Sequence, residues 1–307
     1  MKKYKLVLET LSNLHIGSGN ILQSFDYFYD KEKFNVVDQD KLVDLLISNN
    51  RVNDFVREVA QGTTNSSREL SPTLSKFNID KNNIIKYSLD GHIITDKDIN
   101  RATRARLKPI EEFIKDEEGN PYIPGSSIKG FISNILGIDI KAKNPKMFFS
   151  VSDSKPLSID LLYVSTPVHF NIRNLVVSEW NQMNYVEFLR RGATIEFTII
   201  DYKCTGNFTD DINSKVKMLN KKYNNNFIDK FGIGLNDIYN DDYKNRFMFF
   251  SDNESYFRIG KYTNFLLKTK HISESNTKDG LYNAVKDKVK FMNFKNAKSG
   301  NLPLDIS

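Results

Sequence analysis

The chain has 307 residues and a formal net charge of +6 at pH 7, and 39% of its residues are hydrophobic. This length allows two ordinary domains or one large one. The positive balance favours an anionic partner, most simply a nucleic acid, over a neutral surface with scattered lysines. The single cysteine, Cys204, excludes an internal disulfide and a cysteine-based zinc site. We expect neither a signal peptide nor a membrane-spanning segment, and hence a cytoplasmic protein.

The first part of the chain is predicted to form three strands and a helix. Alternating apolar side chains favour a strand over Lys3–Thr10. Phe25–Tyr29 and Phe34–Val37 are shorter strand-like runs separated by a charged turn. An amphipathic helix is expected to begin at Asp38 or Gln39, because apolar side chains recur after this point at helical spacing.

Three turn sequences predict β-hairpins in the middle of the chain. They are Asp90-Gly91, Glu117–Asn120 and Arg190–Gly192, each between two strand-like runs. The Thr-, Asn- and Ser-rich stretch Gln61–Pro72 is predicted to be a flexible insertion. A helix is expected over Ile128–Leu136. The other strand-like runs of this region are Phe148–Ser152 and Ile159–Phe170.

The periodic patterns become weaker after Tyr202. A polar helix is predicted over Thr209–Leu219, strands over Arg246–Phe250 and Tyr256–Ile259, and a short helix over Leu281–Met292. Strands and hairpins that are interrupted by a few helices favour an α+β fold with antiparallel sheets over a doubly wound parallel sheet. Two sheets of the ferredoxin-like (RRM-like) type fit this length.

The segment Tyr122–Gly130 is the most informative motif. It places a Pro-Gly turn, Ser126, Ser127 and Lys129 at the start of a predicted helix. Free backbone N–H groups, little side-chain bulk and a nearby cation suit the binding of an anionic backbone. The residue order excludes a Walker A loop and a nucleophile elbow. The alternative is a plain helix that is capped by Ser126 or Ser127.

Two residues near the first strand are candidates for acid–base chemistry. His15 precedes a Gly-Ser-Gly turn, where it could act as a general acid or base, hydrogen-bond the turn or stack on a base. Asp26 lies within a strand-like run, and carboxylates there could serve catalysis or bind Mg²⁺, with a structural role as the alternative. The four histidines lack the spacing of a metal site, so we expect no metal and no cofactor.

Two basic clusters are candidates for phosphate contact. Arg101, Arg104 and Arg106 form the first, for which a solvated charged surface is the alternative. The second is Arg258–Phe265, followed by Lys268, where tyrosine and phenylalanine alternate with basic residues. That mixture suits backbone contact together with base stacking, and an ordinary strand–loop–strand with buried phenylalanines is the alternative.

Three of these segments together resemble the RAMP proteins of type III CRISPR effectors. They are Leu11–Gly19, Tyr122–Gly130 and Arg258–Thr269, and they occur in the family's order over nearly the whole chain. The third segment, near the C-terminus, makes the resemblance closest to the subunit that caps the type III-A (Csm) complex. Phe25-Asp26-Tyr27 and Val151–Ser154 also fit that member.

The resemblance implies two RRM-like RAMP domains, an N-terminal one over residues 1–205 with an insertion around 61–108 and a degenerate one over 206–307. It implies a non-catalytic subunit that binds crRNA at its 3′ end and supports crRNA maturation in antiviral defence. The implied partners are crRNA, the neighbouring backbone RAMP subunit, other subunits of the Csm complex and a host nuclease that trims the 3′ end. The alternatives are an endoribonuclease that uses His15 or Asp26, and a scaffold that contacts only proteins.

The residues expected to contact RNA come from the motifs and the basic clusters. They are His15, Gly17, Ser18, Gly19, Arg101, Arg104, Arg106, Gly125, Ser126, Ser127, Lys129, Arg258, Gly260, Lys261 and Lys268. Contacts of this kind would hold the RNA backbone, and backbone contacts carry no sequence preference of their own.

Overall fold

The computed structural model describes residues 1–63, 70–91, 108–138, 148–171, 176–179, 184–203, 208–223, 257, 259–261 and 305–306. Its helices are α1 (Gln39–Ser48), α2 (Val52–Thr63), α3 (Leu70–Lys76), α4 (Gly125–Leu136) and α5 (Phe208–Tyr223), with short 3-10 helices at Lys81–Ile84 and Ile159–Leu161. Its strands are β1 (Lys2–Glu9), β2 (Gly17–Leu22), β3 (Tyr27–Asp30), β4 (Lys33–Val37), β5 (Ile85–Gly91), β6 (Ile110–Phe113), β7 (Phe149–Val151), β8 (Leu162–Ser165), β9 (Val168–Asn171), β10 (Val176–Glu179), β11 (Tyr185–Leu189), β12 (Thr194–Asp201) and β13 (Asp305–Ile306). In these ranges no helix has the length and apolar character needed to cross a membrane.

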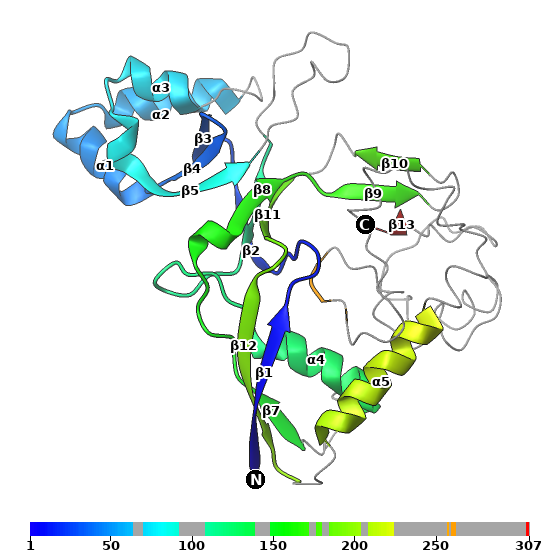
Figure 1. Cartoon of the computed structure of the whole chain (residues 1–307). Helices are drawn as coiled ribbons and strands as arrows, with labels where there is room; N and C mark the ends of the chain where they lie inside the picture. Colours follow the sequence, from blue (N-terminus) through cyan, green and yellow to red (C-terminus); the bar gives the residue numbers. More distant parts are fainter. Residues whose placement is uncertain are drawn as a thin grey trace.

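The largest sheet runs through the middle of the molecule, with the strand order β2-β6-β11-β8-β5-β4-β3 (Figure 1). Its neighbouring strands are antiparallel except for two parallel pairs, β11 with β6 and β5 with β8. Strand β2 lies at one edge, where its register against β6 shifts between Gly17 and Ile21. These mostly antiparallel sheets with a few helices confirm the predicted α+β class.

Successive residues of β3 point to opposite faces of the sheet and reach two hydrophobic cores. Tyr27 is buried in the main core, where its ring centroid lies 5.7 Å from that of Phe34. Phe28 packs on the other side, in a second core with Leu42 and Leu46 of α1. Side chains of α2 and α3 complete this second core, so the three helices gather at one end of the molecule beside β3, β4 and β5 (Figure 1).

The second sheet has the order β1-β12-β7 and carries α4 and α5 on one face (Figure 1). Strand β1 alternates as predicted, since Tyr4 and Leu6 pack toward the core while the residues between them are exposed. Phe208 at the start of α5 closes this layer, with ring centroids 5.9 Å from Tyr4 and 5.5 Å from Phe149. The helix predicted over 209–219 is therefore confirmed and is longer at both ends.

Two tight turns are confirmed. Strands β3 and β4 pair directly, and the turn between them places Lys31 and Glu32 at φ 49° and 63°, in the left-handed region. The predicted hairpin at 117–120 is closed by an antiparallel bridge between Lys115 and Pro121. Gly119 has φ +85° in this turn, a conformation that glycine adopts without strain.

The hairpin predicted at Arg190–Gly192 is wrong. Strands β11 and β12 both exist, but β11 pairs with β6 and β8, whereas β12 pairs with β1 and β7. Thr10 holds the connection between the two sheets: its Oγ1 donates to Arg190 O at 2.7 Å and accepts from Ala193 N at 2.8 Å. Gly192 N also donates to Thr10 O at 2.7 Å. A turn signal identifies the change of direction, and distant contacts decide which strand becomes the partner.

The hairpin predicted at Asp90-Gly91 is also wrong, because β5 continues through both residues. Gly91 pairs in parallel with Val164 of β8. A Cβ atom at Gly91 would lie 2.6 Å from the ring of Phe34, so glycine serves close packing here and not a turn. The second strand predicted for this hairpin, His92–Thr95, lies outside the described residues.

A small third sheet of order β10-β9-β13 includes residues 305–306 of the C-terminal end. The elements predicted at 246–250 and 281–292 lie outside the described residues. The domain division expected after residue 205 stays a prediction, as residues 204–207 also lie outside the described ranges.

Helix α4 begins at Gly125, three residues before the predicted Ile128. Gly125 lies against the main chain of the last residue of β7 and the residue after it. A Cβ atom at Gly125 would lie 2.3 Å from Ser152 O and 2.5 Å from Val151 O. Neither oxygen can move easily, since both belong to the main chain. At Gly130, in the same helix, no atom lies within 4 Å of the corresponding position.

We therefore expect Gly125→Ala and Gly130→Ala to have opposite effects on stability. Gly125→Ala should lower the free energy of unfolding by about 1–3 kcal/mol through overpacking. Gly130→Ala should raise it by about 0.5–1 kcal/mol, because alanine favours a helix interior over glycine. Urea denaturation followed by circular dichroism measures both values. Equal effects of the two variants would contradict the close approach at Gly125.

Candidate nucleic-acid interface

The first motif forms an exposed run at the edge of the large sheet. Leu14 pairs with Leu189 of β11, and β2 starts three residues later at Gly17. The run Gly17–Asn20 is exposed, and Gly19 has φ +94°. The side chain of Ser18 accepts a hydrogen bond from Asn20 N at 3.0 Å, which shapes the turn. An open strand edge with small side chains leaves backbone N–H groups accessible to phosphate oxygens.

His15, next to this run, is buried and only 3% exposed. Its Nδ1 hydrogen-bonds the carbonyl oxygen of Glu187 at 2.8 Å, so Nδ1 carries the proton. Its ring packs edge-on against Phe113 and Phe188, with ring centroids 6.1 Å from each. Burial lowers the pKa of His15, although the hydrogen bond to Glu187 and the nearby Glu111 carboxylate act in the opposite direction. The imidazole hydrogen bond thus goes to β11, whereas the prediction placed it on the Gly-Ser-Gly turn.

The third motif lies directly on the first. Lys261 N donates to His15 O at 3.0 Å. Gly260 has φ +98°, and a Cβ atom there would lie 2.5 Å from His15 O and 2.8 Å from Leu14 Cδ1. Only glycine permits this approach, so two motifs almost 250 residues apart form one unit. The ammonium group of Lys261 forms an ion pair with Glu111.

The start of α4 differs from the predicted serine cap. The N-cap is Pro124, in extended conformation and without a side-chain cap hydrogen bond. Gly125 N instead donates to Asp153 Oδ1 at 2.7 Å, and Ser127 N donates to Pro124 O at 3.0 Å. A carboxylate therefore occupies one position where an anion could bind. Ser126 is exposed.

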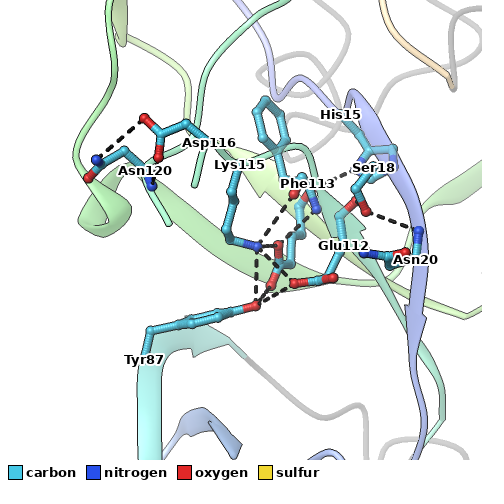
Figure 2. A network of polar contacts seen from close by, with 10 residues as sticks. His15, Ser18, Asn20, Tyr87, Glu112, Phe113, Lys115, Asp116 and Asn120 are labelled. Atoms are coloured by element: carbon cyan, nitrogen blue, oxygen red, sulfur yellow. Dashed lines mark hydrogen bonds and ion pairs between the residues drawn. The ribbon is translucent and has the colours of Figure 1, made fainter. Parts of the chain in front are cut away.

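A buried charge network that the sequence did not predict is centred on Glu187, whose carbonyl oxygen is the hydrogen-bond partner of His15. Glu187, fully buried in β11, accepts hydrogen bonds at Oε2 from Lys115 Nζ at 2.6 Å and from Phe113 N at 2.8 Å. Tyr87 OH donates to Glu187 Oε1 at 2.9 Å. The same hydroxyl lies 3.1 Å from Glu112 Oε1 (Figure 2). Burial raises the pKa of Glu187, and Lys115 acts against this.

The only signal for this network in the sequence is an acidic residue inside the apolar run Tyr185–Leu189. All five residues of that run are buried. A buried carboxylate requires a cation or several donors. The partners Lys115 and Tyr87 are 72 and 100 residues away in the chain, so only the folded sheet brings them together.

Asp26 closes a turn. Its Oδ2 accepts from Gln23 N at 2.7 Å and its Oδ1 accepts from Gln39 Nε2 at 3.1 Å. Burial raises the pKa of Asp26, while the hydrogen bond from Gln23 lowers it. In the described ranges, no three His, Cys, Asp or Glu residues are grouped in a way that could hold a metal ion.

Five of the predicted contact residues lie outside the described ranges. They are Arg101, Arg104, Arg106, Arg258 and Lys268. Lys129, in the first half of α4, is half-buried, and none of the ion pairs among described residues involves it.

The burial of His15 predicts a pH dependence of stability. In the unfolded chain His15 takes up a proton near its ordinary pKa of 6.5, whereas the buried imidazole resists protonation. The contribution of His15 to stability should therefore decrease as the pH falls below 6.5, by at most about 1.4 kcal/mol per pH unit. His15→Asn keeps an N–H donor near the position of Nδ1 but does not titrate. Urea denaturation from pH 7.5 to 5.5 should show a steeper loss for the natural chain, and parallel curves would contradict the buried neutral state.

Comparison with known proteins identifies related sequences. The model of the RAMP superfamily matches residues 7–288. The CRISPR system Cms protein Csm5 of Streptococcus thermophilus is 32% identical over 139 residues, which cover 44% of this chain and 38% of that protein. The protein of the same name from Enterococcus italicus is 27% identical over 215 residues, which cover 64% of this chain and 59% of that protein. The chain thus aligns with between two fifths and three fifths of these relatives.

Two solved structures share the fold. The first is the crystal structure of T. onnurineus Csm5, with a TM-score of 0.54 at 19% identity. The match covers 74% of this chain and 83% of the T. onnurineus chain. The second is a chain of the cryo-EM structure of a Csm–crRNA–target RNA ternary complex from a type III-A CRISPR-Cas system, with a TM-score of 0.65 at 18% identity. This match covers 92% of the chain described here and 90% of the chain in the complex. Because the family model extends over nearly the whole sequence, and these folds agree with it, the chain belongs to the RAMP superfamily.

Proposed function

We propose that this chain is a non-catalytic crRNA-binding subunit that caps the 3′ end of a type III-A CRISPR complex. The observation that carries the proposal is the exposed run Gly17–Asn20 at the edge of the large sheet. This run follows the buried His15, against which Gly260 and Lys261 pack. The curated relatives are named Csm5, and one solved neighbour is a chain of a complex that contains crRNA. These relationships support crRNA as the RNA that the chain binds.

The first and second motifs would hold RNA through its backbone. The Gly17–Asn20 run offers main-chain N–H groups without side-chain bulk. On α4, Ser126 is exposed and Lys129 supplies a cation that is not neutralised by an ion pair with any described residue. Contacts of this type recognise phosphate and sugar and carry no base preference, which suits a subunit that must accept any guide sequence.

The absence of a catalytic role is supported by the two candidate residues themselves. His15 is buried and its pKa is lowered, so it lacks access to a scissile phosphate. The two carboxylate oxygens of Asp26 accept hydrogen bonds, one from Gln23 N in the same turn and one from Gln39 Nε2 at the start of α1. Maturation of the crRNA 3′ end would then depend on a separate host nuclease, with this chain and the neighbouring backbone subunit setting how much RNA is protected.

The double variant Ser126→Ala/Lys129→Ala should bind crRNA more weakly at every guide sequence. Loss of one phosphate contact should also reduce the slope of log affinity against log salt by about 1. Ser75→Ala/Lys76→Ala is the matched control, since it removes a serine and a lysine from α3, where Lys76 already pairs with Glu58. Fluorescence anisotropy with labelled crRNA over a salt series measures both quantities. Unchanged affinity and slope in the α4 variant would refute this placement.

The purified chain should leave crRNA precursor and target RNA uncut, with or without Mg²⁺. The natural chain is compared with His15→Asn and Asp26→Asn on denaturing gels. Cuts at defined sites that disappear in either variant would establish the endoribonuclease alternative. If instead the natural chain showed no affinity for single-stranded RNA at low salt, the protein-only scaffold would replace the proposed function.

A further inference from the structure

Helices α1 and α2 expose apolar side chains that no part of the described chain covers. Val43 and Ile47 on α1 are 47% and 61% exposed, and Val52 and Val56 on α2 are 37% and 58% exposed. Each pair is four residues apart, so each forms a stripe along one side of its helix. The two stripes lie on consecutive helices, one before and one after the connection at residues 49–51. We call these four residues the α1–α2 apolar surface.

These side chains are not needed for the core beneath them. Leu42 and Leu46 of α1 already face the second core and are only 2% and 4% exposed. In an amphipathic helix the positions next to such core residues are normally polar. Val43 and Ile47 break that pattern at adjacent turns, and neighbouring exposed apolar side chains are a feature of surfaces that bind another molecule.

The charge beside the α1–α2 apolar surface is negative. Asp40 and Asp44 share the exposed side of α1 with Val43 and Ile47, at positions i, i+4 and i+3, i+7 of the helix. Neither aspartate forms an ion pair with any described residue.

The cations nearby lie beside acidic residues of the same region. Lys41 Nζ lies 3.2 Å from Asp38 Oδ2. Arg51 NH1 and Arg57 NH1 lie 3.3 Å and 4.0 Å from the two carboxylate oxygens of Asp54, which they share. Residues 38–58 hold five acidic and three basic side chains, so this region stays negative on a chain whose net charge is +6.

This combination selects one class of partner. Phosphates of RNA would be repelled by Asp40 and Asp44, and an apolar stripe offers RNA no backbone contact. A second copy of the same surface would bring the aspartates of both copies together. A protein surface with an apolar centre and lysine or arginine at its border satisfies both features.

We infer that the α1–α2 apolar surface docks a protein subunit whose contact face is apolar and bordered by basic residues. The inference rests on the proposed function for the identity of the assembly, and it adds which face of the chain meets a protein. Helices α1–α3 lie at one end of the molecule, whereas α4 and the β1-β12-β7 sheet lie at the other (Figure 1). A protein bound at α1–α2 therefore leaves the α4 surface open to RNA.

The test uses the complete complex, produced by co-expressing the chain with the other subunits of its own type III-A system and crRNA. Ile47→Asp/Val56→Asp should reduce the chain's incorporation into the purified complex about tenfold. Asp44→Lys, which leaves the apolar residues intact, should reduce it as well by opposing basic residues of the partner. The matched controls are Met218→Asp and Asp210→Lys on α5, where Met218 is 53% exposed. Both controls should be incorporated normally.

Two further measurements separate the outcomes. The α1–α2 variants should bind crRNA in isolation as the natural chain does and should retain its thermal unfolding midpoint. Normal incorporation of both α1–α2 variants would overturn the inference and leave the proposed function intact. Loss of crRNA affinity in these variants would assign the surface to RNA, and a dimer of the natural chain that Ile47→Asp dissociates without affecting incorporation would assign it to a second copy. Failure of the natural chain to bind crRNA would count against the proposed function alone.

Discussion

The carboxylate of Glu187 is the group on which the centre of the large sheet depends. A carboxylate without solvent contact must be matched by a cation and several donors, because removing one partner leaves a buried charge that typically costs about 3–5 kcal/mol. Lys115, Phe113 N and Tyr87 meet this need and connect the 110–115 segment, β11 and β5. The backbone of Glu187 then fixes the ring of His15, and the backbone of His15 accepts from Lys261. One buried charge is thus linked through successive hydrogen bonds to His15, two residues before the exposed glycine run, and to Lys261.

Sequence patterns predicted what local chemistry decides. The alternation in β1, the helix start at Asp38 or Gln39 and the polar helix over 209–219 each correspond to an observed element. The two wrong hairpin predictions have a common cause. A turn signal in the sequence does not determine which strands pair with each other. At Arg190–Gly192 the hydroxyl of Thr10, 180 residues away from Arg190, decides that the chain changes sheets. At Gly91 the ring of Phe34 requires a residue without a side chain. The sequence alone does not distinguish a glycine needed for close packing from one needed for a turn.

The candidate site was predicted as three separate loops, and its supporting residues were not predicted at all. The motifs around His15 and Gly260 touch, which their sequence positions gave no reason to expect. The amide of Gly125 is occupied by Asp153, a partner that becomes visible only when β7 is placed beside α4. Charge counting likewise could not show that Lys261 is neutralised by Glu111 while Lys129 has no such partner among the described residues. In each case the type of residue was recognisable, and its availability depended on a contact from a distant part of the chain.

The contact between Gly260 and His15 has a consequence for the order of events on the ribosome. The chain is made from its N-terminus, so the glycine run near residue 17 emerges long before the residues that support it. Contacts between segments so far apart form late, because closing a long loop costs entropy before any contact compensates for it. The nascent chain therefore lacks a complete Gly17–Asn20 platform until residue 261 has left the ribosome. Only a chain that extends through residue 261 then has the fully supported Gly17–Asn20 run that the proposed function assigns to RNA.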